Sequence, residues 1–307
     1  MKASILVICW NYEQYIKQCL ESILAQTYKD IEVLFLDNFS KDNSYQTAKS
    51  ILESSGISHQ IFQNSSPQSV SKNFNFLLER CSGDYIFPFS ADDWMTPDNV
   101  EEKVDLLKST NAGIVFGGGW YFYEDTGKYI QSDLSLYKRG NMVNNLLLDR
   151  SSYFHPGPAY KKSVIIEVGK WDEDLLVEDL DLNLRVAMKH DVDFVPKPLI
   201  YYRKHSSSFL SNYKLMSKGF QQYYEKYRNF KSLPLDEWLS QNYKWFSFQA
   251  LDDKKYSLSF HFLFLAVKTY FGVHSIIVIG EFIRRYFSRF KLLRRIWLPF
   301  KYYLVKK

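Results

Sequence analysis

Cysteine is scarce in this sequence, which has only Cys9, Cys19 and Cys81 among its 307 residues. Their odd number and irregular spacing exclude a framework of disulfides and a zinc site built from cysteine pairs. A reducing compartment is therefore the expected environment of the protein.

Long apolar runs are also missing. Two uncharged stretches near the C-terminus, 256–267 and 269–280, hold twelve residues each and are separated by Lys268. Neither reaches the roughly 20 residues that a helix needs to span a bilayer. The apolar run Ile5–Trp10 is too short for the core of a signal peptide, so we expect it to form a first strand.

Acidic residues are absent from segment 282–307, although it contains nine Lys or Arg residues. The net charge of +5 therefore comes from this segment, since residues 1–281 carry 30 basic and 34 acidic side chains. Cations mixed with aromatic and aliphatic residues are typical of a helix in the interface of an anionic membrane. A solvated face on a packed helix is the alternative. No nucleic-acid-binding motif accompanies the charge, so nucleic acid is not an expected partner.

Strand and helix patterns alternate through the first 206 residues. Buried strands are expected near 5–10, 31–36, 59–63 and 85–89, and helices near 16–24, 43–54, 69–81 and 98–109. This alternation predicts an α/β fold with a doubly wound, mostly parallel sheet. After residue 208 the composition becomes helical, aromatic and basic. We therefore expect a domain of residues 1–206 and a C-terminal helical region, 207–307.

Two later segments are less regular. The expected strand Gly113–Tyr123 contains Gly117, Gly118 and Gly119, which favour a bend or a close backbone approach. No GxGxxG or Walker spacing accompanies these glycines, so they do not indicate a phosphate-binding loop. The segments 194–195 and 199–202 are predicted to be two short strands.

Two adjacent carboxylates, Asp92 and Asp93, follow the strand expected near 85–89. Ligands of open α/β sheets bind beyond the carboxyl ends of the strands, so these carboxylates are well placed to hold a cation. Carboxylate oxygens together with substrate phosphates suit Mg²⁺ or Mn²⁺. Capping of the next helix is the alternative, because aspartate is common at that position.

A second acidic pair, Glu178 and Asp179, precedes apolar residues at helical spacing. A helix cap is the simpler interpretation of this pair, and a catalytic carboxylate is the alternative. The strand near 199–202 ends in Arg203, Lys204 and His205, three groups that can donate hydrogen bonds to phosphates.

Together these segments resemble the family 2 glycosyltransferases, which have the GT-A fold. The resemblance covers roughly residues 3–206 and rests on six elements in family order: the first strand and helix within 5–28, Asp37 to Ser44, Lys72-Asn73, Ser90 to Asp93, Glu178-Asp179 and Tyr202 to His205.

The resemblance implies transfer from a nucleoside-diphosphate sugar with Mn²⁺ or Mg²⁺ as cofactor. Asp179 is the implied general base for an acceptor hydroxyl, and a single base on that face implies inversion. The other implied roles are donor binding by Ile8, Trp10, Asn11, Asp37, Asn38, Lys72, Asn73 and Asp92; metal binding by Asp92, Asp93 and His205; and contacts on the acceptor or phosphate side by Trp171, Glu178 and Arg203.

The sequence departs from the family pattern at four positions. Ile8, Asn38, Phe39 and Ser90 stand where the family usually has proline, aspartate, glycine and an acid. An asparagine amide can donate as well as accept, so the base of the donor is open, although a UDP-sugar is the expected donor. Two carboxylates remain beside Ser90, so metal dependence is still expected.

The expected function is hexosyl transfer to a glycan or lipid-linked acceptor in cell-surface polysaccharide biosynthesis. The expected place is the cytoplasm, peripherally on the inner face of the cell membrane, with residues 282–307 on the anionic surface. One alternative is a sugar-nucleotide pyrophosphorylase or nucleotidyltransferase, for which a glycine-rich signature after the first strand is missing. Another is a non-catalytic, membrane-associated degenerate transferase, which the departures at Ile8, Asn38 and Ser90 permit.

Overall fold

The computed structural model describes residues 1–149, 151–205, 212–271 and 273–288. Contacts within the chain divide it into two units, Met1–Tyr223 and Tyr224–Lys307. The division falls inside helix α8 (Tyr213–Tyr227), because its first part packs on the first unit: the Gln222 side chain donates to the Asp174 carbonyl at 3.0 Å. The expected boundary at residue 206 and residues 289–307 of the expected membrane segment lie outside the described residues.

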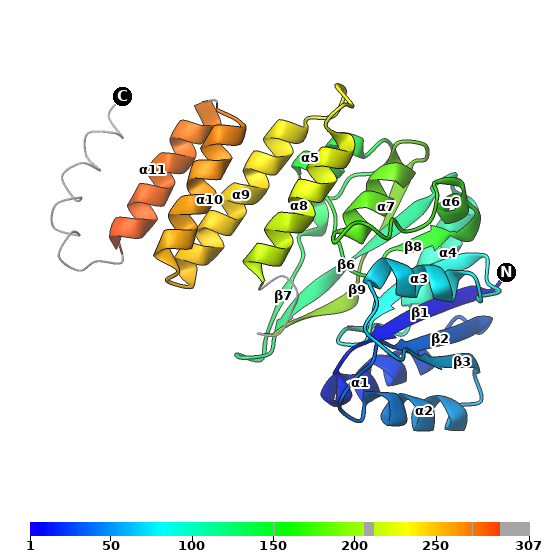
Figure 1. The fold of residues 1–307 in the computed structure, drawn as a ribbon. Helices are drawn as coiled ribbons and strands as arrows, with labels where there is room; N and C mark the ends of the chain where they lie inside the picture. Colours follow the sequence, from blue (N-terminus) through cyan, green and yellow to red (C-terminus); the bar gives the residue numbers. More distant parts are fainter. Residues whose placement is uncertain (150, 206–211, 272, 289–307) are drawn as a thin grey trace. The chain divides into compact units, whose positions relative to one another are not determined.

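A single sheet forms the centre of the first unit (Figure 1). Its order is β3-β2-β1-β4-β8-β6-β9-β5, and β7 pairs with β6 outside this path. The strands are β1 (Ala3–Cys9), β2 (Ile31–Asp37), β3 (Ser58–Gln63), β4 (Tyr85–Ser90), β5 (Trp94–Met95), β6 (Ile114–Tyr123), β7 (Lys128–Gln131), β8 (Ala159–Lys161) and β9 (Val192–Lys204). Strands β3, β2, β1 and β4 are parallel, as are β6 and β9, whereas β8 and β5 run antiparallel to their neighbours. The predicted mostly parallel sheet is confirmed.

Helices pack on both faces of the parallel strands. Figure 1 shows α1 and α2 on one side of β1 to β3 and α3 on the other. Strands covered on both faces are buried along their whole length, which explains why β1 and β2 are continuous apolar runs with almost no exposed residue. The helices of this unit before α8 are α1 (Glu13–Leu24), α2 (Ser44–Ser54), α3 (Val70–Leu78), α4 (Asn99–Ser109), α5 (Val143–Leu148), α6 (Lys162–Glu167) and α7 (Glu178–Ala187), with a short 3-10 helix, η1 (Leu134–Leu136).

The carboxyl ends of three neighbouring strands lie level with one another. In the register of the sheet, Cys9 of β1 pairs with Asp37 of β2, and Ile8 pairs with Ser90 of β4. The loops that follow these strands therefore emerge at one edge, which is where an open α/β sheet binds its ligands. All three cysteines are free and buried.

Strand β9 corrects one expectation and confirms another. It is a single strand of 13 residues, not two short strands, and it continues through Pro196 and Pro198. Its register against β6 shifts between Gly117 and Gly118 and again between Gly118 and Gly119, so the predicted irregularity is confirmed. Gly119 is also a close approach, because a Cβ there would lie 2.5 Å from the carbonyl oxygen of Ile200.

The second unit consists of helices, namely the end of α8 with α9 (Leu235–Asp252), α10 (Tyr256–Thr269) and α11 (Val273–Ser288). Helices α9 and α10 pack closely where Ser247 and Ser259, both fully buried, each donate a hydroxyl hydrogen bond to the other's carbonyl, at 2.9 and 2.8 Å. Within the described part of the chain, no helix combines the length and apolar character needed to cross a bilayer.

Candidate active site

The loops after β1 and β2 are fastened to each other by hydrogen bonds. The backbone N–H of Asn11 donates to Ser40 Oγ at 2.8 Å, and the Asn11 side chain accepts from the backbone N–H of Lys41 at 2.7 Å. Asp37 accepts from the backbone N–H of Ser40 at 3.0 Å. The predicted donor-binding residues Asn11 and Asp37 are therefore brought together, and the two loops form one wall of the sheet edge.

An asparagine network lies behind this wall. Asn38 donates from its amide to the Gln68 carbonyl at 3.0 Å and accepts from the Gln68 backbone N–H at 2.9 Å. Asn64 donates to the amide oxygens of both Asn38 and Asn73, at 2.8 and 2.9 Å. Asp37 Oδ1 and Asn73 Nδ2 are buried without a hydrogen-bond partner among the described residues. The Asn38 amide is thus committed to the chain itself, whereas Asp37 and Asn73 each keep one group for a ligand or water.

Three other predicted donor residues lie around the same edge. Trp10 is 55 % exposed on the loop after β1, and Ile8 is half-buried near the end of that strand. Lys72 is exposed in the first turn of α3, where its backbone N–H is capped by Ser69 Oγ. A side chain at a helix start, together with the N-terminal end of the dipole, suits a phosphate.

Asp92 and His205 face each other directly. His205 Nε2 lies 3.0 Å from Asp92 Oδ2, and both side chains are nearly buried. Tyr12 also approaches this pair, because its ring meets the His205 imidazole edge-on at 5.9 Å and its hydroxyl hydrogen-bonds Asp92. Burial and the charge on Asp92 raise the pKa of Tyr12, so its hydroxyl remains a donor to the carboxylate.

Asp93 lies deeper than Asp92. It is 5 % exposed and accepts the backbone N–H of Arg203 at 2.9 Å. Burial, together with the charge on Asp92, raises the pKa of Asp93 well above its usual range. Two neighbouring buried carboxylates are costly when both are charged, and a cation beside them offsets that cost.

Arg203 makes its contacts within the protein. Its side chain is buried, with the guanidinium carbon 4.3 Å from the ring centroid of Tyr15 and 4.7 Å from that of Trp94. It donates to the Asp92 carbonyl at 2.9 Å and to Gln18 Oε1 at 2.6 Å. These contacts hold the Asp92-Asp93 loop against β9, so this geometry gives Arg203 a positioning place and does not fit the predicted phosphate contact.

Asp92, Asp93 and His205 fit part of the shell of a divalent cation. Their donors are two carboxylates and one imidazole, and the two buried carboxylates leave negative charge to be neutralised. Among the described residues, no group of three or more His, Cys, Asp or Glu side chains is arranged to hold a metal ion, so a cation here would need ligands from the substrate and water. This donor set suits Mg²⁺ or Mn²⁺, which bind through one or two carboxylates and complete the shell with substrate phosphates and water.

The second acidic pair stands at the start of α7. The Asp179 side chain is 54 % exposed, with Oδ2 3.3 Å from Nδ1 of His155 and Oδ1 accepting the Leu180 backbone N–H at 2.7 Å. Its neighbour Glu178 is half-buried. Burial and the charge on Asp179 raise the pKa of Glu178 to about 8, so Glu178 is mainly protonated at pH 7. The predicted helix start is confirmed, and the geometry also leaves Asp179 accessible for chemistry.

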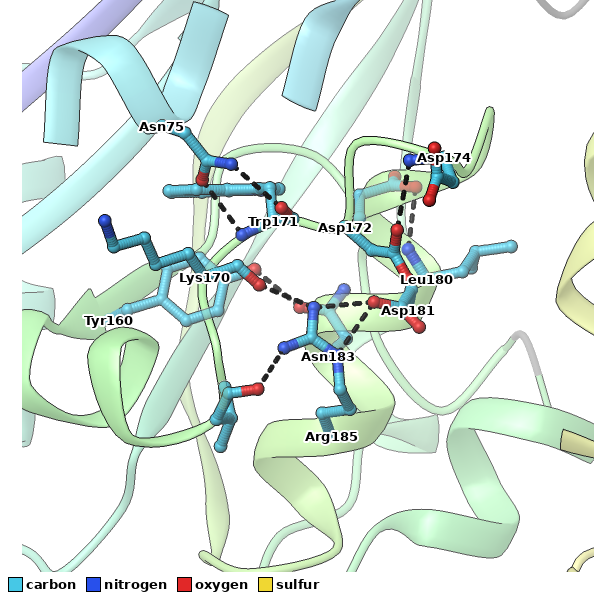
Figure 2. Close-up of polar contacts among 12 residues, drawn as sticks. Asn75, Tyr160, Lys170, Trp171, Asp172, Asp174, Leu180, Asp181, Asn183 and Arg185 are labelled. Carbon is cyan, nitrogen blue, oxygen red and sulfur yellow. Dashed lines mark hydrogen bonds and ion pairs between the residues drawn. The ribbon is translucent and has the colours of Figure 1, made fainter. Parts of the chain in front are cut away.

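The loop before α7 is fixed by a hydrogen-bond network (Figure 2). Asn75 of α3 donates to the Trp171 carbonyl at 2.9 Å and accepts its N–H at 3.1 Å. Arg185 of α7 donates hydrogen bonds to the Asp181 carboxylate and to the Lys170 carbonyl, both at 2.6 Å. Trp171 itself is 3 % exposed and stacks on Phe74. Its burial does not fit the predicted acceptor contact, and its place in the structure is in the core.

Tyr202 relates the two acidic pairs to each other. It is half-buried on β9, and its pKa is raised by burial and then by the charges on Asp93, Asp92 and Asp179. Lys204 lies two residues further along the same strand, with its ammonium 4.7 Å from the Tyr202 ring centroid. The charges that raise the pKa of Tyr202 thus include one carboxylate from the second acidic pair, Asp179, as well as Asp92 and Asp93.

Two contributors, His155 and Tyr12, had no distinct signal in the sequence. His155 stands in the segment between α5 and β8, and Tyr12 follows the first strand. Only the folded chain places His155 beside Asp179 and Tyr12 beside Asp92. Tyr202, by contrast, belongs to the Tyr202–His205 element of the family resemblance.

The family model of glycosyl transferase family 2 matches residues 4–169, which is more than half of the chain. The chain belongs to glycosyl transferase family 2. This family assignment favours sugar transfer over the pyrophosphorylase alternative.

Two relatives each align with about two thirds of this chain. Glycosyltransferase GlyA of Streptococcus pneumoniae is 27 % identical over 218 residues, covering 66 % of this chain and 30 % of GlyA. The O-antigen biosynthesis glycosyltransferase WbnJ of Escherichia coli is 23 % identical over 67 % of this chain and 80 % of WbnJ. The matched part of the chain spans about a third of the length of GlyA.

Solved structures show the fold. The mannosyltransferase PcManGT from Pyrobaculum calidifontis, in complex with GDP-Man and Mn²⁺, matches with a TM-score of 0.64 at 14 % identity, over 99 % of this chain and 85 % of that chain. TarS 1–349 of S. aureus, in complex with UDP-GlcNAc, matches with a TM-score of 0.61 at 15 % identity, over 95 % and 84 %. The predicted GT-A fold with C-terminal helices is confirmed.

Proposed function

We propose that this chain is an inverting, metal-dependent glycosyltransferase that moves a sugar from a nucleoside diphosphate to a hydroxyl group of a glycan or lipid-linked acceptor. The observation that carries the proposal is that strand β9 is near both acidic pairs: Arg203 donates its backbone N–H to Asp93 at 2.9 Å, and the charge on Asp179 contributes to the raised pKa of the neighbouring Tyr202. A transferase needs both groups at one place, because the leaving diphosphate and the attacking hydroxyl act on the same anomeric carbon.

Asp179 is the residue that we assign as general base. Its exposed carboxylate is accessible to an acceptor hydroxyl and is oriented by His155 and by the Leu180 N–H. Burial and the charge on Asp179 raise the pKa of its neighbour Glu178 to about 8, so Glu178 is the less suitable base of the two. A single base supports direct displacement with inversion, since a retaining double displacement needs a carboxylate nucleophile as well.

Asp92, with Asp93 and His205 beside it, is the group that would hold Mn²⁺ or Mg²⁺. Such an ion supplies positive charge that neutralises the departing diphosphate. The Mn²⁺ in the PcManGT complex supports the same requirement in this chain. Lys72, exposed at the start of α3, adds a cation that can contact the diphosphate.

The donor and acceptor classes rest on relatives. Neighbouring structures contain UDP-GlcNAc and GDP-Man, and we propose a UDP-sugar as the donor of this chain. The name of WbnJ links it to O-antigen biosynthesis, which supports a role in surface polysaccharide assembly here. A cytoplasmic enzyme on the inner face of the membrane would meet both a soluble donor and a lipid-linked acceptor.

The membrane contact that we propose involves the second unit. Residues 224–307 carry sixteen Lys and Arg residues against six Asp and Glu, so this part of the chain is strongly positive. Phe264 of α10 is 62 % exposed and Phe271, which follows that helix, is 68 % exposed. Exposed rings beside cations suit an anionic lipid surface, which adds to the sequence argument for residues 282–307.

The test combines donor binding with one substitution. Isothermal titration with a panel of UDP- and GDP-sugars should show binding of one donor that requires Mn²⁺ and disappears with EDTA. Asp179→Asn should keep that donor affinity and lower kcat by roughly 100-fold or more, the scale of a general base. Asp105→Asn, an exposed aspartate on α4, is the matched control and should have normal kcat.

Three results would count against this function. Absence of donor binding would support the non-catalytic alternative, and normal turnover of Asp179→Asn would remove the assigned base. Retention of the anomeric configuration in the product, measured by NMR, would contradict inversion.

A further inference from the structure

Phe39 has a backbone conformation that is unusual for a large side chain. Its φ is +66°, in the left-handed region, where a bulky residue is disfavoured by contact between Cβ and the following carbonyl. The described non-glycine residues with positive φ are Asn11, Phe39, Lys170 and Lys254, and Phe39 is the large apolar one. A strained residue of this kind persists only where the surrounding structure imposes it, and it often marks a functional site.

Burial in the core does not compensate for this strain. Phe39 is half-buried, and among the described residues it belongs neither to the hydrophobic core nor to the side chains that pack against it. The conformation is imposed by its neighbours instead, since the Ser40 N–H binds Asp37 and the Lys41 N–H binds Asn11. The chain thus presents an aromatic ring at the sheet edge at a cost in stability.

One face of the Phe39 ring is already occupied. The ammonium group of Lys41 lies 3.3 Å from the ring centroid, which fixes the ring by a cation–π contact. On the neighbouring loop, Trp10 is 55 % exposed and also lies outside the core. Cys9 and Asp37 pair in register, so Trp10 and Phe39 follow adjacent strand ends at the same edge of the sheet.

The asparagine beside Phe39 gives a second, independent reason to expect a ligand contact here. Asn38 stands where the family resemblance implies recognition of the donor, yet its amide is paired with both backbone groups of Gln68. A donor nucleotide at this edge therefore needs a source of affinity other than the Asn38 amide. Aromatic faces are such a source, because every base has a π-face that stacks without specific hydrogen bonds.

We propose that the face of Phe39 opposite Lys41 stacks on the base of the donor nucleotide, as a second aromatic surface beside Trp10. This inference rests on the proposed function, because it requires a nucleotide donor. Donor binding would then explain why the strained conformation of Phe39 is kept. A glycine at this position would relieve the strain, but it would remove the stacking surface.

The test compares the thermal stability of a Phe39 variant with its affinity for nucleotides. Phe39→Gly should have an unchanged or higher Tm, because glycine adopts this φ without strain. Its Kd for UDP or GDP, measured with Mn²⁺ present, should rise about tenfold or more, the scale of losing one base-stacking ring. The Kd of inorganic pyrophosphate with Mn²⁺ should stay the same, since pyrophosphate has no base. Phe39→Tyr keeps the ring and should keep the nucleotide affinity.

Lys254→Gly is the matched control, because Lys254 also has a positive φ of 61° and lies in the second unit. It should gain or keep stability without any change in nucleotide affinity. If wild type binds neither nucleotide, the proposed function fails. If wild type binds but Phe39→Gly binds equally well, the stacking inference alone is wrong. It is also wrong if nucleotide and pyrophosphate affinities fall together, since the ring would then support the loop and not the base.

Discussion

The carboxylate of Asp179 is held from two sides. The Leu180 N–H contacts one oxygen at 2.7 Å, and His155 Nδ1 lies 3.3 Å from the other. The turn that contains His155 and Gly157 is held by Lys103, a fully buried residue of α4. The Lys103 ammonium donates to the Gly157 carbonyl at 2.5 Å. Burial lowers the pKa of Lys103 to about 7. A base whose orientation is set before the acceptor arrives loses less entropy in the transition state.

His155→Ala should lower kcat about fivefold while the KM for the donor stays the same. The reason is that one orienting contact of the base, worth about 1 kcal/mol, is lost, whereas the residues proposed to bind the donor are unchanged. Steady-state kinetics with saturating acceptor measure the split, and His155→Asn, which keeps a donor at this position, should recover part of kcat. His261→Ala, on the exposed side of α10, is the control. An unchanged kcat in His155→Ala would show that Asp179 does not depend on this contact.

Among the elements, the loop between α3 and β4 illustrates how the strands are held at the edge opposite the site. Glu32 of β2 is buried and accepts a hydroxyl hydrogen bond from Ser4 at 2.6 Å, as well as backbone N–H groups of Ser82 and Gly83. Burial alone would raise the pKa of Glu32, but the hydrogen bonds from Ser4, Ser82 and Gly83 outweigh it and lower the pKa. One carboxylate therefore joins β1, β2 and the segment that enters β4.

Glu32→Gln should destabilise the protein by about 2 kcal/mol at pH 7, because an amide cannot accept this set of donors and some are left unsatisfied. The lowered pKa fixes the sign of the pH dependence. The contribution of the carboxylate is present above the unfolded-state pKa of about 4.3 and is lost as pH falls through the lower folded-state pKa. Urea unfolding of both proteins at pH 7 and below pH 4 measures this, and the difference should shrink at acid pH. A constant difference would contradict the ionic role of Glu32.

On the scale of the whole molecule, charge is divided between the two units. Residues 1–223 carry 23 basic and 28 acidic side chains, whereas residues 224–307 carry 16 and 6. The part that contains the carboxylates of the site is therefore negative, and the helical part is positive. The positive charge of residues 224–307 supports the contact with an anionic surface that we propose for them.

Liposome flotation tests the proposed attraction of the chain to an anionic lipid surface. The full chain should float with vesicles containing phosphatidylglycerol and should float less at high salt, because salt screens the attraction. Removing residues 289–307, which leaves α11 whole and takes away seven Lys or Arg residues, should abolish most of the flotation. Phe264→Ser with Phe271→Ser should weaken it at all salt concentrations. Full flotation after both changes would locate the attachment elsewhere.

Much of the fold could be predicted because the pattern is local. Continuous apolar runs at β1, β2 and β4 and helical spacing between them are enough to indicate a parallel sheet and its helices, and both are observed. The single strand β9 was not predictable in this way, since Pro196 and Pro198 interrupt its pattern. It continues because its register against β6 shifts at the three glycines, a pairing between segments about 80 residues apart that follows no local rule.

The same distinction between local patterns and distant contacts applies to the candidate site. The sequence by itself determined the donor edge and the two acidic pairs, because Asp37, Asp92 and Asp179 stand at strand ends or helix starts that local patterns reveal. Only the tertiary structure decided what surrounds them. It buried Trp171 and Arg203, for which the resemblance implied contacts on the acceptor or phosphate side, and it brought His155 to Asp179. The physical reason is that burial and charge coupling depend on which distant segments meet, and sequence spacing does not contain that information.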